Sequence, residues 1–221
     1  MVEILKKHKD YIIVYKPPGI PTQSDTTGDP DAMGLAGEML KEQGEKGSLW
    51  LIHRLDRTVG GLLVFARNKG AAARLSELVV NRGICKHYYA VAEGVPEDGV
   101  YSDLIFKDSA LGKAYIVDRE RRGVKRAVLS LRTVATANGI TLVEIKLETG
   151  RFHQIRAQLS HRGTPLVGDG KYGSRDKGAR MPSLFAYKLA FEYDGEHVEI
   201  AKMPDTDVYP WSQFKEYLSG V

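Results

Sequence analysis

The stretch Leu49–Asn68, LWLIHRLDRTVGGLLVFARN, decides how we expect this chain to fold. The apolar runs near its two ends have the length and the β-branched or aromatic content of buried strands. Between these runs lies the ionic cluster His53-Arg54-Leu55-Asp56-Arg57. The Gly60-Gly61 pair that follows allows the backbone to turn sharply or to approach another stretch of chain closely. Charged residues between two core strands are held at a rigid edge of a fold, so Asp56 is our candidate for a reactive group.

Composition places few limits on function. The chain has 221 residues, of which 43% are hydrophobic and 27% are charged, as in an ordinary globular protein with a sizeable core. The single Cys85 excludes an internal disulfide, which favours a reducing compartment, and we expect a cytoplasmic location. No apolar run approaches the ~20 residues of a membrane span, and no signal peptide is recognisable. The net charge of +4 is compatible with a polyanionic partner without requiring one.

Strand and turn signals dominate the rest of the chain, with a few helices between them. Strands are expected over 11–15, 84–92, 114–117, 127–134, 140–147, 184–193 and 197–201. Helices are expected over 31–43, 69–82, the end of 149–159, and 211–218. Because many strands join through hairpins, such as the one at Asn138-Gly139, we predict an α+β fold with a largely antiparallel mixed sheet and helices on its faces. We expect a single domain over 1–221.

One connection between expected strands is very basic. It carries Arg119, Arg121, Arg122, Lys125 and Arg126. Such a hairpin tip can grip phosphates, and we take the first four as candidate RNA-binding residues. A solvated loop whose charges only aid solubility is an equally good interpretation of this segment alone.

The string His-Arg-Leu-Asp is by itself a weak signal. Leu55 breaks the pattern of a kinase catalytic loop, and no glycine-rich phosphate loop or downstream Asp-Phe-Gly accompanies it. An Asp that pairs with a neighbouring Arg at a strand end is the plain structural alternative.

Four further blocks change this balance, because together with the first they resemble the RluA-type RNA pseudouridine synthases in the same order. The blocks are Lys16–Gly19 for K-P-x-G, His53–Asp56 for H-R-L-D, Lys86–Ala90 for K-x-Y-x-A, Leu147–Arg156 for L-x-T-G-R-T-H-Q-I-R, and Gly168–Gly173 for G-D-x-x-Y-G. The resemblance spans the catalytic domain of that family. We expect no accessory RNA-binding domain before it.

The resemblance implies an enzyme that breaks the glycosidic bond of a uridine in RNA, rotates the base and rejoins it through carbon. It puts the essential carboxylate at Asp56, which can act as nucleophile or base without a metal or other cofactor. The carboxylate must be ionised, and a guanidinium at contact distance favours the charged form. Arg156 is the expected partner of Asp56. Tyr88 is expected to lie against the uracil, because aromatic rings gain free energy by stacking on bases.

The resemblance also implies base flipping, since a base inside a stem cannot reach a carboxylate on the protein. Arg54 is expected to fill the vacated space in the RNA, because its planar cation stacks on bases and pairs with phosphates. A salt bridge to a surface acid is the alternative for Arg54. We expect His53 to orient its loop, and His153 with Gln154 to fix the helix of Arg156.

Two departures from the family pattern lie next to these residues. Val59-Gly60-Gly61 stands where many relatives have Thr-Ser-Gly, and Phe152 stands where the family usually has Thr. These changes remove two or three hydroxyl groups, so they bear on target choice and loop geometry more than on the reaction.

We therefore expect an isomerase that acts as a monomer on a uridine of structured rRNA or tRNA, with no membrane partner. A catalytically silent RNA-binding module that keeps the fold is the alternative, although a pure binder has no use for Asp56, Tyr88 and Arg156 together. An acid-dependent hydrolase or a metal enzyme is disfavoured. The six His residues show no ligand spacing such as H-E-x-x-H, and no second acid lies near Asp56 in sequence.

Overall fold

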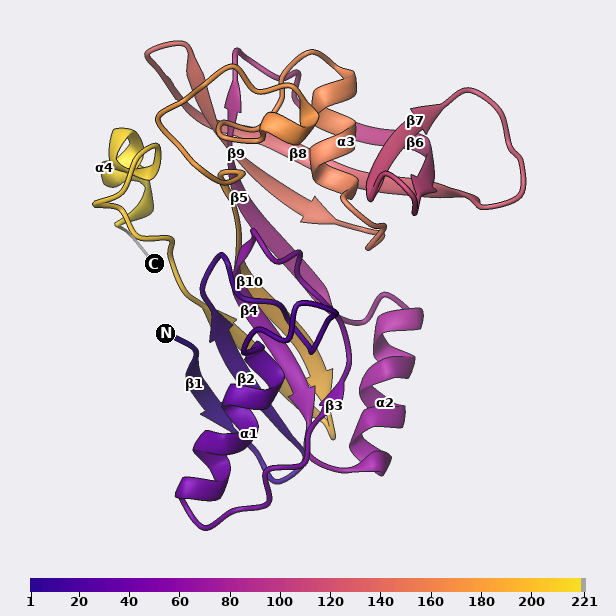
Figure 1. Cartoon of the computed structure of the whole chain (residues 1–221), viewed down its shortest axis with the longest axis vertical. Helices are drawn as coiled ribbons and strands as arrows, with labels where there is room; N and C mark the ends of the chain where they lie inside the picture. The colour runs from indigo at the N-terminus through magenta and orange to yellow at the C-terminus, as the bar shows by residue number, and fades with distance from the viewer. Residues whose placement is uncertain (220–221) are drawn as a thin grey trace. The chain divides into compact units, whose positions relative to one another are not determined.

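The computed structural model describes residues 1–219, which form two compact units (Figure 1). The first unit contains Met1–Ile84 and Ala186–Lys202, and the second contains Cys85–Phe185 and the segment from Met203 onward. A single domain over the whole chain remains a prediction. In the described part of the chain, no helix is long and apolar enough to cross a membrane, and no cluster of three His, Cys, Asp or Glu side chains is placed to hold a metal ion.

The first unit is built on a sheet whose neighbouring strands are β1, β2, β4 and β10, with β3 beside β4 and β11 beside β10. The bounds are β1 Glu3–Lys7, β2 Tyr11–Lys16, β3 Trp50–Leu51, β4 Gly60–Ala66, β10 Leu184–Tyr193, of which Ala186 onward belongs here, and β11 Glu196–Ala201. The pairs β1–β2, β2–β4, β3–β4 and β10–β11 are antiparallel. Both strands expected on either side of the His53–Arg57 cluster are present, and the first is only two residues long.

Two capped helices accompany this sheet, α1 over Ala32–Glu42 and α2 over Lys69–Val80 (Figure 1). The Asp31 carboxylate accepts a hydrogen bond from the Gly34 N–H at 3.0 Å, and the Asn68 side chain accepts one from Ala71 at 2.8 Å. The left-handed residue after α2 is Arg82, with φ 58°. This conformation allows the Gly83 N–H to donate to the Leu78 carbonyl at 2.7 Å, which closes the helix end.

Gly61 is where the first unit needs a residue without a side chain. Its φ is +130°, and an added Cβ would lie 2.4 Å from the Ala186 carbonyl oxygen of β10. The strand β4 is buried throughout, so neither backbone has room to shift. The close approach predicted for the glycine pair is thus made by Gly61.

The second unit is built on five consecutive neighbours in the order β5, β9, β8, β6 and β7, all antiparallel. The bounds are β5 Cys85–Glu93, β6 Gly99–Asp108, β7 Lys113–Val117, β8 Val124–Ala137 and β9 Ile140–Leu147. The strand β6 was not predicted, because polar and charged residues interrupt it and only Tyr101 and Ile105 are buried. The predicted hairpin between β8 and β9 is confirmed, with Asn138 and Gly139 both at positive φ.

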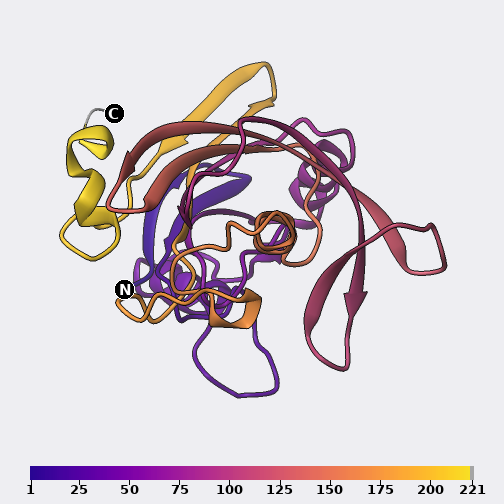
Figure 2. The same ribbon diagram turned by 90° about the horizontal axis from the view of Figure 1, so that it is seen from above.

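Helix α3, Gln154–His161, packs inside the curve of this sheet (Figure 2). Ala157 of α3 shares a buried cluster with Ile105, Ala114 and Ala127 of the strands and with Tyr172. The remaining short helices are η1 Gly170–Tyr172, η2 Trp211–Phe214 and α4 Lys215–Leu218, so the closing helix expected over 211–218 is split into two. The predicted α+β class, with largely antiparallel pairing and helices on the sheet faces, is confirmed.

Candidate active site

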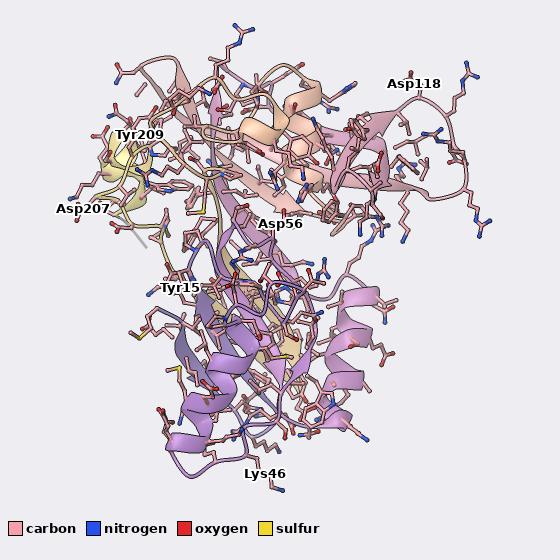
Figure 3. All side chains as sticks on the ribbon, viewed as in Figure 1. Tyr15, Lys46, Asp56, Asp118, Asp207 and Tyr209 are labelled. Carbon is pink, nitrogen blue, oxygen red and sulfur yellow. The ribbon has the colours of Figure 1, made fainter. Side chains whose placement is uncertain are left out.

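Asp56 lies in the loop between β3 and β4 of the first unit (Figure 3). The preceding Leu55 is buried, and its backbone exchanges two hydrogen bonds with the buried Thr22 hydroxyl, at 2.8 and 3.1 Å. The Val59 N–H donates to the Asp56 carbonyl at 3.0 Å and closes the turn behind it. The backbone of this half-buried carboxylate is therefore fixed on both sides.

Lys16, at the end of β2, is hydrogen-bonded to the same loop. Its side chain is fully buried, and Nζ donates to the carbonyls of Pro17, Ile20 and Arg57 at 3.1, 2.8 and 3.2 Å. Burial lowers the pKa of Lys16 to about 7, while the negative charge of Asp56 opposes that shift. In the sequence, Lys16 had drawn attention only as part of the Lys16–Gly19 block. A lysine that ends an apolar strand directly before Pro-Pro-Gly was the signal for its anchoring role.

The other charged residues of this loop behave differently from one another. His53 accepts a hydrogen bond from the Val64 N–H of β4 at 3.3 Å, which fits the predicted orienting role. Arg57 pairs with Asp29 and donates to the Gly19 carbonyl at 3.1 Å. Arg54 is exposed, and within residues 1–219 it has no ion-pair partner, so the alternative of a surface salt bridge finds no support.

In the second unit, Arg156 of α3 forms a buried bidentate pair with Asp169. The Arg156 Nε donates to Oδ2 at 2.7 Å and Nη2 donates to Oδ1 at 2.8 Å, with the two residues 5% and 1% exposed. The guanidinium carbon also lies 4.9 Å from the centre of the Tyr172 ring. In the sequence, Asp169 and Tyr172 were recognised only as members of the Gly168–Gly173 block, and no role was predicted for them. The expected pairing of Arg156 with Asp56 remains a prediction.

His153 precedes α3 in a left-handed conformation, with φ 51°, and its protonation state follows from its contacts. The Tyr172 hydroxyl accepts a hydrogen bond from the Ala114 N–H at 2.7 Å and lies 3.0 Å from His153 Nδ1. Burial, with Arg156, Lys171 and Lys107 nearby, lowers the pKa of His153 to about 3. A neutral imidazole fits the supporting role that we expected.

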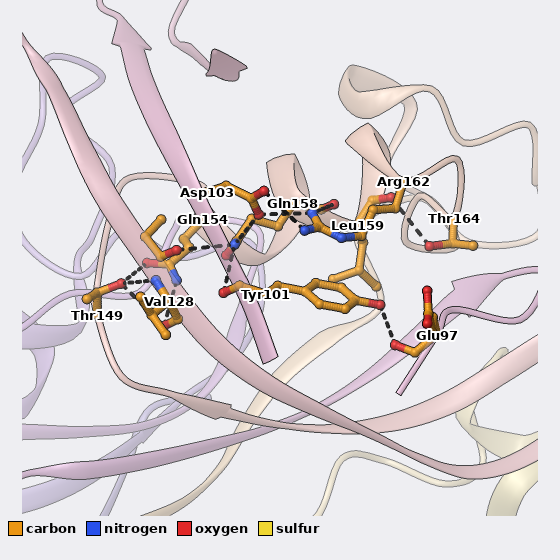
Figure 4. Close-up of polar contacts among 11 residues, drawn as sticks. Glu97, Tyr101, Asp103, Val128, Thr149, Gln154, Gln158, Leu159, Arg162 and Thr164 are labelled. Atoms are coloured by element: carbon orange, nitrogen blue, oxygen red, sulfur yellow. Dashed lines mark hydrogen bonds and ion pairs between the residues drawn. The ribbon is translucent and has the colours of Figure 1, made fainter. Parts of the chain in front are cut away.

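Gln154 ties the start of α3 to the sheet (Figure 4). Its Oε1 accepts hydrogen bonds from the Thr149 hydroxyl at 2.8 Å and the Arg151 N–H at 3.0 Å, and its Nε2 donates to the Val128 carbonyl at 3.1 Å. One turn later, Gln158 donates to Asp103 at 2.6 Å. These contacts support the predicted role of Gln154 in fixing the helix that carries Arg156.

Tyr88 lies on β5 of the second unit and is buried. In an antiparallel sheet its direct neighbour is Ile145 of β9, which in turn pairs with Leu131 of β8. The ring is therefore fixed in a row of apolar side chains on one sheet face.

Comparison with known proteins adds to this geometry. The family model described as RNA pseudouridylate synthase matches residues 10–161, which include Asp56, Tyr88 and Arg156. The chain belongs to this family.

An uncharacterised RNA pseudouridine synthase of Haemophilus influenzae is 29% identical, covering 92% of this chain and 88% of the relative. The ribosomal large subunit pseudouridine synthase D of Yersinia pestis is 30% identical, covering 91% and 62%. The solved structure of human RNA pseudouridylate synthase domain containing 4 has a TM-score of 0.75 and 25% identity, covering 98% of this chain and 92% of that one. The predicted family is confirmed, and its named members are isomerases.

Phe152, a departure from the pseudouridine synthase pattern, replaces a hydroxyl group with a stacked ring. The Phe152 and His153 ring centres are 3.8 Å apart with planes inclined by 17°, and Lys107 Nζ lies 4.7 Å from the Phe152 ring centre. The phenyl ring also packs against the cluster that holds Ala157 of α3. Aromatic packing by Phe152 thus supports His153.

The basic connection joins β7 to β8 in the second unit. Asp118 marks it in Figure 3, and its Arg119, Arg121 and Arg122 are exposed. Lys125, which was expected in the same connection, lies at the start of β8 and is also exposed. The Arg121 guanidinium lies 4.7 Å from the centre of the Phe106 ring, so this cation rests on an aromatic face. Exposed cations next to an aromatic ring are typical of surfaces that bind nucleic acids, although solvated charges have the same exposure.

Proposed function

We propose that this chain converts a specific uridine of structured RNA to pseudouridine. The observation that carries the proposal is the family match over residues 10–161, which contains Asp56, Tyr88 and Arg156. In the reaction the bond from N1 of uracil to the sugar breaks and a bond from C5 to the same sugar carbon forms. C5 loses a proton and N1 gains one, so the change needs no oxidant, reductant or second substrate.

Asp56 is the essential carboxylate in this proposal. A carboxylate can attack the sugar or the base, or remove a sugar proton, and each of these needs a fixed position and the ionised form. The hydrogen bonds of Leu55 and Val59 on either side of Asp56 support the first requirement. The positive charge of Lys16 near Asp56 supports the second when Lys16 is protonated.

Tyr88 and Arg156 complete the proposed machinery. Tyr88 lies against the uracil, and Arg156 stabilises the negative charge of Asp56. The bidentate pair with Asp169 supports this role for Arg156, because it holds the guanidinium in one orientation. The target base is flipped out of its stem, and the exposed Arg54 enters the space that it leaves.

The RNA backbone is bound by the basic connection, with Arg119, Arg121, Arg122 and Lys125 as phosphate contacts. The RNA is an rRNA or a tRNA. The name of the Yersinia pestis relative makes large-subunit rRNA the first one to test. The lone Cys85, which cannot form an internal disulfide, supports action in the cytoplasm, and we propose that the chain acts as a monomer.

The test is to incubate the purified chain with uridine-labelled rRNA and tRNA and to map any pseudouridine formed. We expect product at a defined position in one class of RNA. Positions that lose the modification in cells without this chain should agree with that map. Tight RNA binding with no product in any RNA would instead identify a catalytically silent binding module.

A further inference from the structure

Lys86, on β5 of the second unit, is a partly buried cation. Within residues 1–219 its ammonium group has no hydrogen-bond or ion-pair partner. Its Nζ lies 3.6 Å from the point where a side chain on Gly150 would begin. Gly150 is exposed, so the ammonium group sits beside an open position of the loop that precedes α3.

The strand register places Lys86 on the same face of the sheet as α3. Ala127 of β8 packs with Ala157 of α3, and Leu129 shares the face of Ala127 because side chains alternate along a strand. Leu129 pairs with Leu147 of β9, and Leu147 pairs with Lys86. All three side chains therefore point toward the concave side that α3 occupies in Figure 2.

Tyr88 lies two residues further along β5 and shares this face with Lys86. Two residues of a strand span about 7 Å, which is close to the distance from the centre of a base to its own phosphate group. A nucleotide that lies on Tyr88 thus has its phosphate within reach of the long Lys86 side chain.

A cation in this environment needs an anion. Partial burial removes water from the ammonium group and lowers the pKa of Lys86, and no carboxylate of the described residues compensates for the loss. An apolar residue of similar length would avoid that cost. The free energy is recovered only when a ligand brings negative charge to Nζ, and a backbone phosphate offers two charged oxygens that accept hydrogen bonds from the ammonium group.

We propose that Lys86 binds an RNA backbone phosphate, namely that of the nucleotide whose base lies on Tyr88. The identity of that nucleotide as the target uridine rests on the proposed function. The phosphate contact itself requires only that the chain binds RNA through this face.

The test measures binding of an oligouridylate to the full chain in an Asp56→Asn background, which prevents turnover, with and without Lys86→Met. We expect Lys86→Met to weaken binding several-fold and to flatten the slope of log K against log salt by about 0.7 over roughly 50 to 200 mM. Lys86→Arg should keep the slope, because it keeps the charge. A Lys86→Met slope equal to that of the parent would overturn the proposal.

Lys146→Met is the matched control. Lys146 lies on β9 next to Leu147, points to the opposite face, and pairs with Glu148 at 3.6 Å. Its loss removes the same charge from the same sheet, and we expect it to leave the slope close to that of the parent. A slope that falls equally in both variants would also overturn the proposal, because it would report net charge alone.

Turnover separates this proposal from the proposed function. In the chain with Asp56 intact, Lys86→Met should raise KM for the substrate RNA and change kcat little, since a backbone contact binds ground state and transition state alike. If no RNA is isomerised but the slope depends on Lys86, the phosphate contact stands and the proposed function fails. If product forms while Lys86→Met changes neither the salt slope nor KM, the phosphate contact is refuted and the proposed function stands.

Discussion

Lys16 and Lys86 are both lysines removed from water on strands, yet their surroundings differ completely. In the first unit, Lys16 donates to three backbone carbonyls and joins the loop of Asp56 to the segment after β2. In the second unit, Lys86 has no such acceptors among residues 1–219. Burial alone therefore does not assign a role to a lysine. A cation with its acceptors in place stabilises the fold, whatever further role it has, whereas a buried cation that lacks them can recover its lost hydration by binding an anionic ligand.

The largest loss of stability is expected when the partner of the buried Arg156 is neutralised. Asp169→Asn removes the charge that faces a nearly buried guanidinium, and we expect the free energy of unfolding to fall by about 3–5 kcal/mol in denaturant titrations. The matched change Asp207→Asn acts on an exposed pair with Lys215 and should cost less than about 1 kcal/mol. Equal small losses in the two variants would show that a buried, partnered cation is not structural here.

The two lysines themselves should give opposite results in the same titration. Lys16→Met leaves three carbonyls of the first unit without their donor, and we expect a loss of about 3 kcal/mol. Lys86→Met removes a charge that has no partner among residues 1–219, so the free energy of unfolding should change by less than about 0.5 kcal/mol or increase. A loss of stability in Lys86→Met that matches the loss in Lys16→Met would remove the distinction between the two residues.

His153 extends the comparison to a buried base that faces cations, and it predicts a pH dependence. The pKa of His153 is about 3 in the fold against an ordinary 6.5, so between these values the unfolded chain binds more protons than the folded one. Stability should therefore fall as pH falls from about 6.5, by about 1 kcal/mol near pH 5 after allowance for solvent. In His153→Asn, where Asn suits the left-handed backbone, this part of the acid sensitivity should be absent. An unchanged pH profile would place the titration elsewhere.

Substitutions in the basic connection should have the smallest effect on stability and should change only RNA binding. Neutralising Arg119, Arg121 and Arg122 together should leave stability unchanged, because exposed charges contribute little. RNA affinity should fall evenly across sequences, and the salt slope should flatten by up to about 0.7 for each contact that is lost. An unaltered slope would leave these arginines as solvated charges.

Sequence reasoning found most elements of the fold and the family. Apolar patterns and caps such as Asp31 and Asn68 were sufficient for the helices of the first unit, and motif order was sufficient for Asp56, Tyr88 and Arg156 as candidates. The strand β6 escaped because its pairing with β7 and β8 outweighs a polar sequence. The partners of Lys16 and Arg156 escaped because they come from segments whose approach only the fold determines.

Product formation by Asp56→Asn tests the central claim most directly, since the amide keeps the size of the side chain and removes its charge. The measurement is pseudouridine formed per mole of protein in a single turnover, on an RNA that the unmodified chain converts, with binding of that RNA checked in parallel. The account predicts undiminished binding and no detectable pseudouridine. Conversion at the rate of the unmodified chain would contradict it.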